Sequence, residues 1–395
     1  MSIKNNYRHT IYACYIGYIT QAIINNFAPL LFLTFHNVYN IPLEKIGLLV
    51  TVNFCTQLLV DMLSVKFVDR IGYRAAVVLA HVLAAVGFIG LGILPDLFQG
   101  PYMGLCIAVI FYAIGGGLTE VLISPIVEAC PTDNKSAAMS LLHSFYCWGS
   151  VLVVLVSTLL FKIMGIDSWK VIACLWAIIP ALNAFYFTQV PIVSLEEKGE
   201  SMGIGMLLRN KLFWVMALLM ICSGASELAM SQWASAFAES GLHVSKAAGD
   251  LAGPCFFAVL MGLARIVHAK FGEKIELTKY LFFCALSCIC SYLLAALSPI
   301  AVLSLLGCGI CGFSVGAMWP GTFSLASEKC PQGGTAMFAL LALAGDTGCS
   351  LGPTVVGYVS AALSDNLKLG LLSAVVFPIL LLGGLGLCRG YSKNK

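Results

Sequence analysis

Apolar residues run along most of this chain in long, nearly unbroken stretches. Each stretch holds about 20 residues or more, the length at which an α-helix crosses the roughly 30 Å hydrocarbon core of a bilayer. Strands of a membrane barrel would instead show shorter segments of alternating polarity. The pattern therefore predicts an all-α membrane protein with twelve spans, near residues 10–36, 45–67, 75–94, 102–128, 136–162, 168–190, 211–238, 247–270, 277–297, 299–327, 334–362 and 367–388.

The longest polar interruption, residues 191–210, divides these spans into six plus six. It predicts an N-terminal six-helix bundle over 1–190, a cytoplasmic linker over 191–210 and a C-terminal bundle over 211–395. The halves also repeat, because Glu128 and Cys130 near the end of span 4 recur 200 residues later as Glu328 and Cys330 near the end of span 10. Parallel repeats of this kind indicate two bundles around a central substrate site, with alternating access by rocking.

Positive charges set the expected orientation. With the N-terminus in the cytoplasm, the inner loops and tails hold 16 of the 22 Lys and Arg residues, and the outer loops hold 5. Cytoplasmic loops of membrane proteins carry this excess. We therefore expect both termini in the cytoplasm of a cell, a multi-pass plasma-membrane location and a bacterial source.

Composition agrees with a membrane protein and excludes other classes. Hydrophobic residues make up 59% of the chain, charged residues 10%, and mean hydropathy is +0.93. The net charge of +3 is not clustered, so no nucleic acid partner is expected. Most of the 16 cysteines lie in apolar runs, where they act as small packing residues. No nucleotide-binding loop, catalytic triad or metal motif is present, so we expect neither an enzyme, a cofactor nor a bound metal. The N-terminal apolar stretch is too long for a cleaved signal peptide.

The turn after span 2, residues 69–74, reads Asp-Arg-Ile-Gly-Tyr-Arg. It resembles the loop 2–3 signature of the major facilitator superfamily, with Val65 in place of the leading glycine. The resemblance implies the twelve-helix fold of that superfamily over nearly the whole chain.

Spans 1, 4 and 5 resemble the fucose–galactose–glucose proton symporter family more narrowly. That family carries a glutamate five residues before a proline in span 4, where this chain has Glu120 and Pro125. Its Gln-x-Phe-Asn-x-x-Gly segment matches span 5, with His143 in the Gln place and Tyr146 in the Asn place. The family's span 1 carboxylate is Asn25 here. The resemblance implies proton-coupled sugar uptake.

Charges inside the membrane are functional candidates because each is costly there. A carboxyl group in a low-dielectric site favours its protonated form, which makes Glu120 and Glu227 candidate proton carriers. Glu227 is expected to replace the acid that is missing at Asn25. For both, a fixed polar contact with a neighbouring helix is the alternative. Gating or structural roles are predicted for the other charges in and next to the spans: Asp61, Asp69, Arg70, Arg74, Arg265 and Asp346. Asp346 is expected to pair with Arg265 or near the 69–74 turn.

Uncharged polar and aromatic residues in the spans are candidates for binding a hydroxylated solute. Amides spaced four residues apart share a helix face, and tryptophans stack on sugar rings. The alternative is helix–helix hydrogen bonding or an interfacial aromatic belt. The predicted substrate-binding residues are Gln21, Asn25, Asn26, Asn53, Gln57, His143, Tyr146, Trp148, Gln232, Trp233 and Trp319.

The leading hypothesis is a secondary transporter that imports a small polar solute, a sugar or polyol, by proton-coupled symport with alternating access. Sodium is the alternative coupling ion. A second hypothesis keeps the fold and reverses the traffic, as an exporter of drugs or metabolites by proton antiport. The third, a membrane sensor that binds without transport, is disfavoured because no soluble domain accompanies the spans. We expect a monomer in the lipid bilayer.

Overall fold

The computed structural model describes residues 6–131, 135–193, 204–271, 276–330 and 334–393. Within these residues the chain is α-helical, and twelve helical segments are long and apolar enough to cross a membrane. Their bounds lie within a few residues of the predicted spans, from Tyr7–Tyr39 for the first to Leu367–Cys388 for the last. The prediction of an all-α membrane protein with twelve spans is confirmed.

Contacts divide the chain into two compact units, described here one at a time. Unit 1 comprises Met1–Ile41 and Val52–Glu197, and unit 2 comprises Pro42–Thr51 and Lys198–Lys395. The domain bounds read from the sequence stay a prediction.

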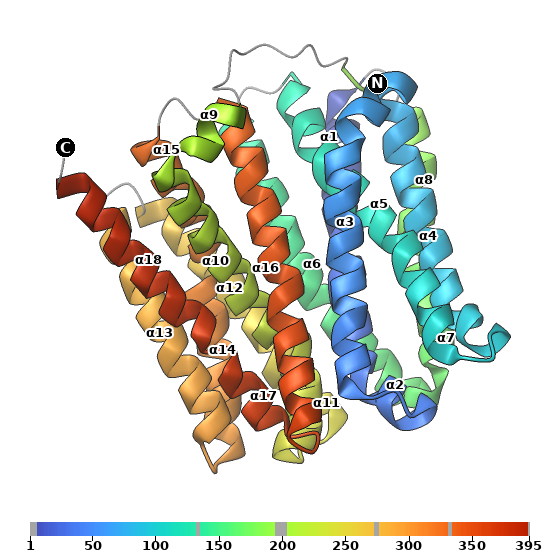
Figure 1. The fold of residues 1–395 in the computed structure, drawn as a ribbon. Helices are drawn as coiled ribbons and strands as arrows, with labels where there is room; N and C mark the ends of the chain where they lie inside the picture. Colours follow the sequence, from blue (N-terminus) through green and yellow to red (C-terminus); the bar gives the residue numbers. More distant parts are fainter. Residues whose placement is uncertain (1–5, 132–134, 194–203, 272–275, 331–333, 394–395) are drawn as a thin grey trace. The chain divides into compact units, whose positions relative to one another are not determined.

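Unit 1 holds the first six spans (Figure 1). They are built from α1 (Tyr7–Asn26), η2 (Ala28–Leu31), α2 (Phe32–Tyr39), α3 (Leu43–Ile71, whose first turns group with unit 2), α4 (Tyr73–Leu97), α5 (Pro101–Ala129), α6 (Lys135–Met164), η3 (Ile166–Ser168), α7 (Trp169–Trp176) and α8 (Ile178–Gln189). Span 1 breaks at Pro29, because proline removes a backbone donor and crowds the preceding turn.

Unit 2 holds the short helix α9 and the last six spans (Figure 1). Its elements are α9 (Ile204–Arg209), α10 (Lys211–Ala236), η4 (Phe237–Gly241), α11 (Lys246–Asp250), η5 (Leu251–Cys255), α12 (Phe256–Phe271), α13 (Leu277–Leu297), α14 (Ala301–Val315), α15 (Met318–Lys329), α16 (Gly334–Ala362), α17 (Leu367–Ser373) and α18 (Val376–Lys393). The π-helical η5 contains Pro254.

The two halves begin alike. Asn6 caps α1 by accepting a hydrogen bond from the backbone N–H of Arg8 at 3.0 Å, and Asn210 caps α10 by accepting one from Leu212, also at 3.0 Å. Each amide satisfies an N–H that has no intrahelical partner. The start of span 7 thus repeats the start of span 1.

Small residues bring the helices of each unit into backbone contact, as is common in membranes. In unit 1, α4 and α5 lie side by side, and a β-carbon on Gly115 would lie only 2.5 Å from the carbonyl oxygen of Ala80 (Figure 1). In unit 2, α10 and α16 pack in the same way, since a β-carbon on Gly348 would lie 2.0 Å from the carbonyl oxygen of Ile221.

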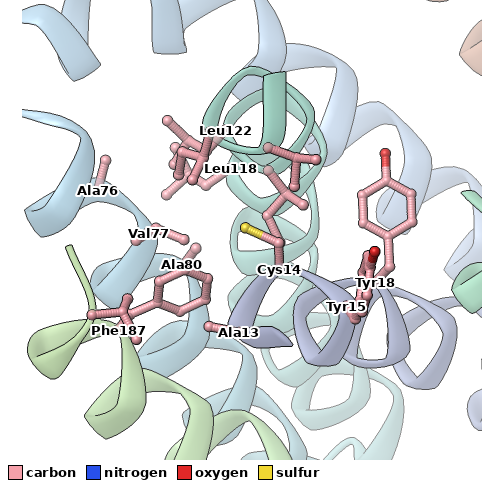
Figure 2. Close-up of a cluster of buried hydrophobic side chains, with 14 of the residues drawn as sticks. Ala13, Cys14, Tyr15, Tyr18, Ala76, Val77, Ala80, Leu118, Leu122 and Phe187 are labelled. Atoms are coloured by element: carbon pink, nitrogen blue, oxygen red, sulfur yellow. The ribbon is translucent and has the colours of Figure 1, made fainter. Parts of the chain in front are cut away.

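An apolar core at one end of unit 1 joins α1, α4, α5 and α8. Figure 2 shows small side chains of α4 and Ala13 of α1 packed among larger side chains of α1, α5 and α8. The labelled members are Ala13, Cys14, Tyr15, Tyr18, Ala76, Val77, Ala80, Leu118, Leu122 and Phe187. This core holds α1 and α5 in the register that brings their polar residues together further along the same helices.

Candidate functional site

Amide side chains of α1 and α3 meet inside unit 1. Gln21 and Asn25 stand one turn apart on α1, and Asn53 and Gln57 stand one turn apart on α3. All four are at least nine-tenths buried. The predicted shared faces therefore turn toward each other and form one hydrogen-bonded group, which we call the amide cluster.

Gln57 is the centre of the amide cluster. Its Nε2 donates to Asn25 Oδ1 at 3.1 Å and to Asn53 Oδ1 at 3.0 Å, so both of its hydrogens are used. Its Oε1 accepts from Gln21 Nε2 at 2.9 Å, and Asn53 Nδ2 donates to Asn25 Oδ1 at 3.2 Å. These bonds fix the orientation of the Gln57 amide, since a buried polar atom without a partner is costly.

The amide cluster extends to a carboxyl group on α5. Gln21 Nε2 donates its second hydrogen bond to Glu120 Oε2 at 3.3 Å. Protein atoms surround Glu120 closely, yet its side chain is exposed, although it lies well inside a membrane span. A carboxylate facing lipid would be very unfavourable, so this exposed surface fits a path open to water.

Gly116 and Gly117 make room for this arrangement. A β-carbon on Gly116 would lie 3.1 Å from Gln21 Oε1, and one on Gly117 would lie 3.1 Å from Asp61 Oδ1. Asp61 follows Gln57 by one helical turn on α3, so it continues the polar face of that helix. Its Oδ1 is buried without a hydrogen-bond partner among the described residues, as is Gln21 Oε1.

Helix α6 closes another side of the cluster. Asn25 Nδ2 donates to Tyr146 Oη at 3.4 Å, and Asn26 Nδ2 donates to Ser150 Oγ at 3.0 Å. His143 is exposed, and its ring meets the Tyr18 ring edge-on at 5.4 Å between centroids. Of the predicted residues of spans 1 and 5, Asn25 and Tyr146 thus contact each other, while Asn26 and His143 contact Ser150 and Tyr18.

Trp148 is on a different face of α6. It is 45% exposed and shares a stripe with Leu152, Leu155 and Leu159, which are exposed as well. This stripe is apolar and does not include the residues that contact the amide cluster.

In unit 2, Glu227 is buried in α10 and is attracted electrostatically by Arg265 of α12. Tyr292 of α13 lies nearby and donates its hydroxyl to the carbonyl oxygen of Ser226 at 2.7 Å. Glu227 thus has an opposite charge within reach, unlike Glu120. Its role in proton coupling stays a prediction.

The other candidates of unit 2 pack tightly. Trp233 has no exposed surface, and its Nε1 donates to the carbonyl oxygen of Pro353 at 2.9 Å, while Gln232 beside it is buried too. The half-buried Trp319 packs its ring on Gly345, next to the buried Asp346. The pairing of Asp346 with Arg265 stays a prediction.

The turn between α3 and α4 carries three of the charges predicted to act in gating or structure. Arg70 is exposed, and the side chain of Asp69 lies outside the described residues. Arg74 Nη1 donates to the carbonyl oxygens of Phe187 at 2.9 Å and Thr188 at 3.2 Å, near the end of α8. A cation is favourable there because the last carbonyls of a helix carry partial negative charge.

Sequence reasoning missed the grouping of Asp61 with the amide cluster, since it assigned Asp61 to a gate. The spacing Asn53–Gln57–Asp61 is a signal that could have shown it. Sequence reasoning also missed a partly buried ion pair in unit 2, where Lys246 Nζ lies 2.9 Å from Oδ1 of the buried Asp250. The four-residue spacing of these two opposite charges is again a usable signal.

Comparison with known proteins agrees with this architecture. The curated relative is an uncharacterised MFS-type transporter of Enterobacter sp. (strain 638), 23% identical over 359 residues, with 87% of each chain covered. Among solved structures, a bacterial homologue of the human lysosomal transporter Spinster, in an inward-facing and occupied conformation, has a TM-score of 0.80 at 14% identity, covering 98% of this chain and 97% of the other.

Two sugar–proton symporters have the same fold. The D-xylose–proton symporter has a TM-score of 0.76 at 14% identity and covers 96% of this chain and 97% of its own. The fucose:proton symporter of E. coli has a TM-score of 0.65 at 14% identity and covers 97% and 99%. Residues 14–353 match the model of the Major Facilitator Superfamily. The chain belongs to the Major Facilitator Superfamily and is a membrane transporter of that family.

Proposed function

We propose that this transporter carries a small solute with several hydroxyl groups, a sugar or a polyol, by proton-coupled symport with alternating access. The observation that carries the proposal is the amide cluster of α1 and α3, joined through Gln21 to the exposed carboxyl group of Glu120. It supplies hydrogen-bonding groups and a titratable group at one place in the membrane.

The chemistry of the cluster suits hydroxyl groups. Amides offer both donors and acceptors, and a hydroxyl group both donates and accepts, so the two match in either direction. Gln21 Oε1 is buried without a donor in the described residues, and a solute hydroxyl would supply one. A purely apolar solute would leave Gln21 Oε1 without a donor, which disfavours hydrophobic compounds as cargo.

Glu120 is the residue proposed to carry the proton. It makes no ion pair with any residue that the structure describes, so protonation would remove an uncompensated charge from the membrane interior. The xylose and fucose symporters named above couple their sugars to protons, which supports the same coupling in this fold.

Uptake into proteoliposomes tests the proposal. Labelled D-xylose, L-fucose, D-glucose and D-mannitol are offered with and without an inward proton gradient, and at least one should accumulate only with the gradient. Glu120→Gln should abolish accumulation and keep solute exchange, because the glutamine retains an acceptor for Gln21 and loses the proton site. Asp167→Asn, an exposed carboxyl in η3, is the matched control and should behave as wild type.

Three results would count against the proposal. Absence of gradient-driven uptake for all four solutes removes the sugar or polyol. Gradient-driven efflux instead of uptake indicates the exporter. Accumulation by Glu120→Gln at the wild-type level removes Glu120 from proton coupling.

A further inference from the structure

Asp61 of α3 lies beside the glycine segment of α5, the helix that carries Glu120. The β-carbon position of Gly117 is 3.1 Å from Asp61 Oδ1, and Glu120 follows Gly117 by about one helical turn. The two carboxyl groups are close enough to repel each other electrostatically when both are charged.

Among the side chains that the structure describes, no Lys or Arg forms an ion pair with either carboxyl group. Helix α1 contributes Gln21, and Tyr18, whose hydroxyl lies 3.0 Å from Ser124 Oγ. Helix α3 contributes Gln57, and α6 contributes His143, whose ring lies against Tyr18. Neither carboxyl makes an ion pair in the part of the chain that the structure describes. The charge of the pair is therefore not compensated by a neighbouring side chain.

The hydrogen bonds of the pair leave one gap. Glu120 Oε2 accepts from Gln21, while Asp61 Oδ1 is buried and accepts from no described donor. A proton on Glu120 Oε1, donated to Asp61 Oδ1, fills this gap and removes one of two like charges. Carboxyl pairs in proteins share a proton for this reason.

We infer that Asp61 and Glu120 form a carboxyl pair that shares one proton, so that Asp61 is a second member of the proton-coupling group. The inference deepens the proposed proton coupling and rests on the role given there to Glu120. With one proton, the pair carries a single negative charge. Proton release then requires both carboxylates to be charged side by side, which keeps the proton bound until a change of surroundings stabilises the second charge.

Infrared spectroscopy of the purified protein without solute tests this directly. At neutral pH the wild type should show one carboxylic acid C=O band from the pair, which disappears at alkaline pH. Both Asp61→Asn and Glu120→Gln should shift the frequency of this band or remove it at neutral pH, because each variant abolishes the hydrogen bond that the shared proton makes to the second carboxylate. Asp96→Asn is the control: Asp96 is exposed and bonded to Lys170 at 2.6 Å, so its loss should leave the band unchanged.

The inference is overturned if one single variant keeps the band unchanged, since the acid then belongs to one residue alone. It is also overturned if sodium chloride, in place of potassium chloride, removes the band at neutral pH, because the pair then binds a cation. Should Asp61→Asn fail to give monodisperse protein, Asp61→Glu keeps a carboxyl group at this position and should shift the frequency of the band, and an unchanged band there overturns the inference. Failure of sugar uptake leaves this result untouched, so the two proposals fail separately.

Discussion

Replacing Gln57 by leucine removes the centre of the amide cluster. The side chain is 2% exposed and makes three hydrogen bonds, of 2.9, 3.0 and 3.1 Å. Leucine fills a similar volume, so the change tests polarity more than packing. Asn53 Oδ1 loses its one described donor, while Asn25 Oδ1 and Gln21 Nε2 each keep one other partner.

The expected cost follows from these losses. A fully unpartnered buried acceptor costs about 1–3 kcal/mol, and each of the other two lost bonds about 0.5–1.5 kcal/mol. The total is about 2–6 kcal/mol, which corresponds to a fall in melting temperature of about 5–20 °C for a unit of this size. No amide flip restores the bonds, because leucine offers neither a donor nor an acceptor.

A thiol-reactive dye measures this melting well, because most of the described cysteines are buried and react only on unfolding. The control is Gln189→Leu, at the end of α8, where the exposed amide bonds only to neighbouring Thr188. It should shift stability by less than about 0.5 kcal/mol. If Gln57→Leu melts within about a degree of Gln189→Leu, the amide cluster does not stabilise unit 1 as argued.

Two further changes, one in each unit, are tested by the same melting measurement: the first tests helix packing and the second tests an ion pair. Gly117→Ala places a β-carbon 2.9 Å from a backbone oxygen of α3, so we expect destabilisation of about 1–3 kcal/mol. The control is Gly90→Ala, whose β-carbon comes close to a movable leucine side chain and should leave stability unchanged. Equal melting temperatures of the two variants would contradict the close approach of α3 and α5. Lys246→Met removes the cation beside the fully buried Asp250, which keeps its hydrogen bond from Ser235, and should cost up to about 3 kcal/mol. Most of this cost should be recovered when Asp250→Asn is added. A double variant as unstable as the single one would show that the cost is not electrostatic.

Part of the candidate site was predictable from the sequence, and part of it was not. The spacing of Gln21 with Asn25 and of Asn53 with Gln57 predicted two shared faces, and the structure brings them into contact. The same spacing did not show that Trp233 is enclosed and bonded to Pro353, because periodicity says which residues share a face and not what that face meets.

Asp61 shows the limit most clearly. From the sequence it is a charge near the inner end of a span, and this position favoured a role in gating. Its meaning depends on Gly117 of a helix more than 50 residues away, whose missing side chain lets the carboxyl group approach. Such an approach is a property of two helices and leaves no mark on either alone.

The sequence by itself determined that the chain lies in a lipid bilayer, how many spans it has and to which broad family it belongs. Lipid requires apolar helices of a fixed length, so hydropathy along the chain is enough to find them. The tertiary structure alone decided which polar faces meet, which carboxyl groups stand together and which tryptophan is enclosed. These arrangements depend on the distances between helix backbones, which glycines and tight packing set. In lipid, burying apolar surface does not favour one helix pair over another, so close packing and hydrogen bonds determine which helices associate.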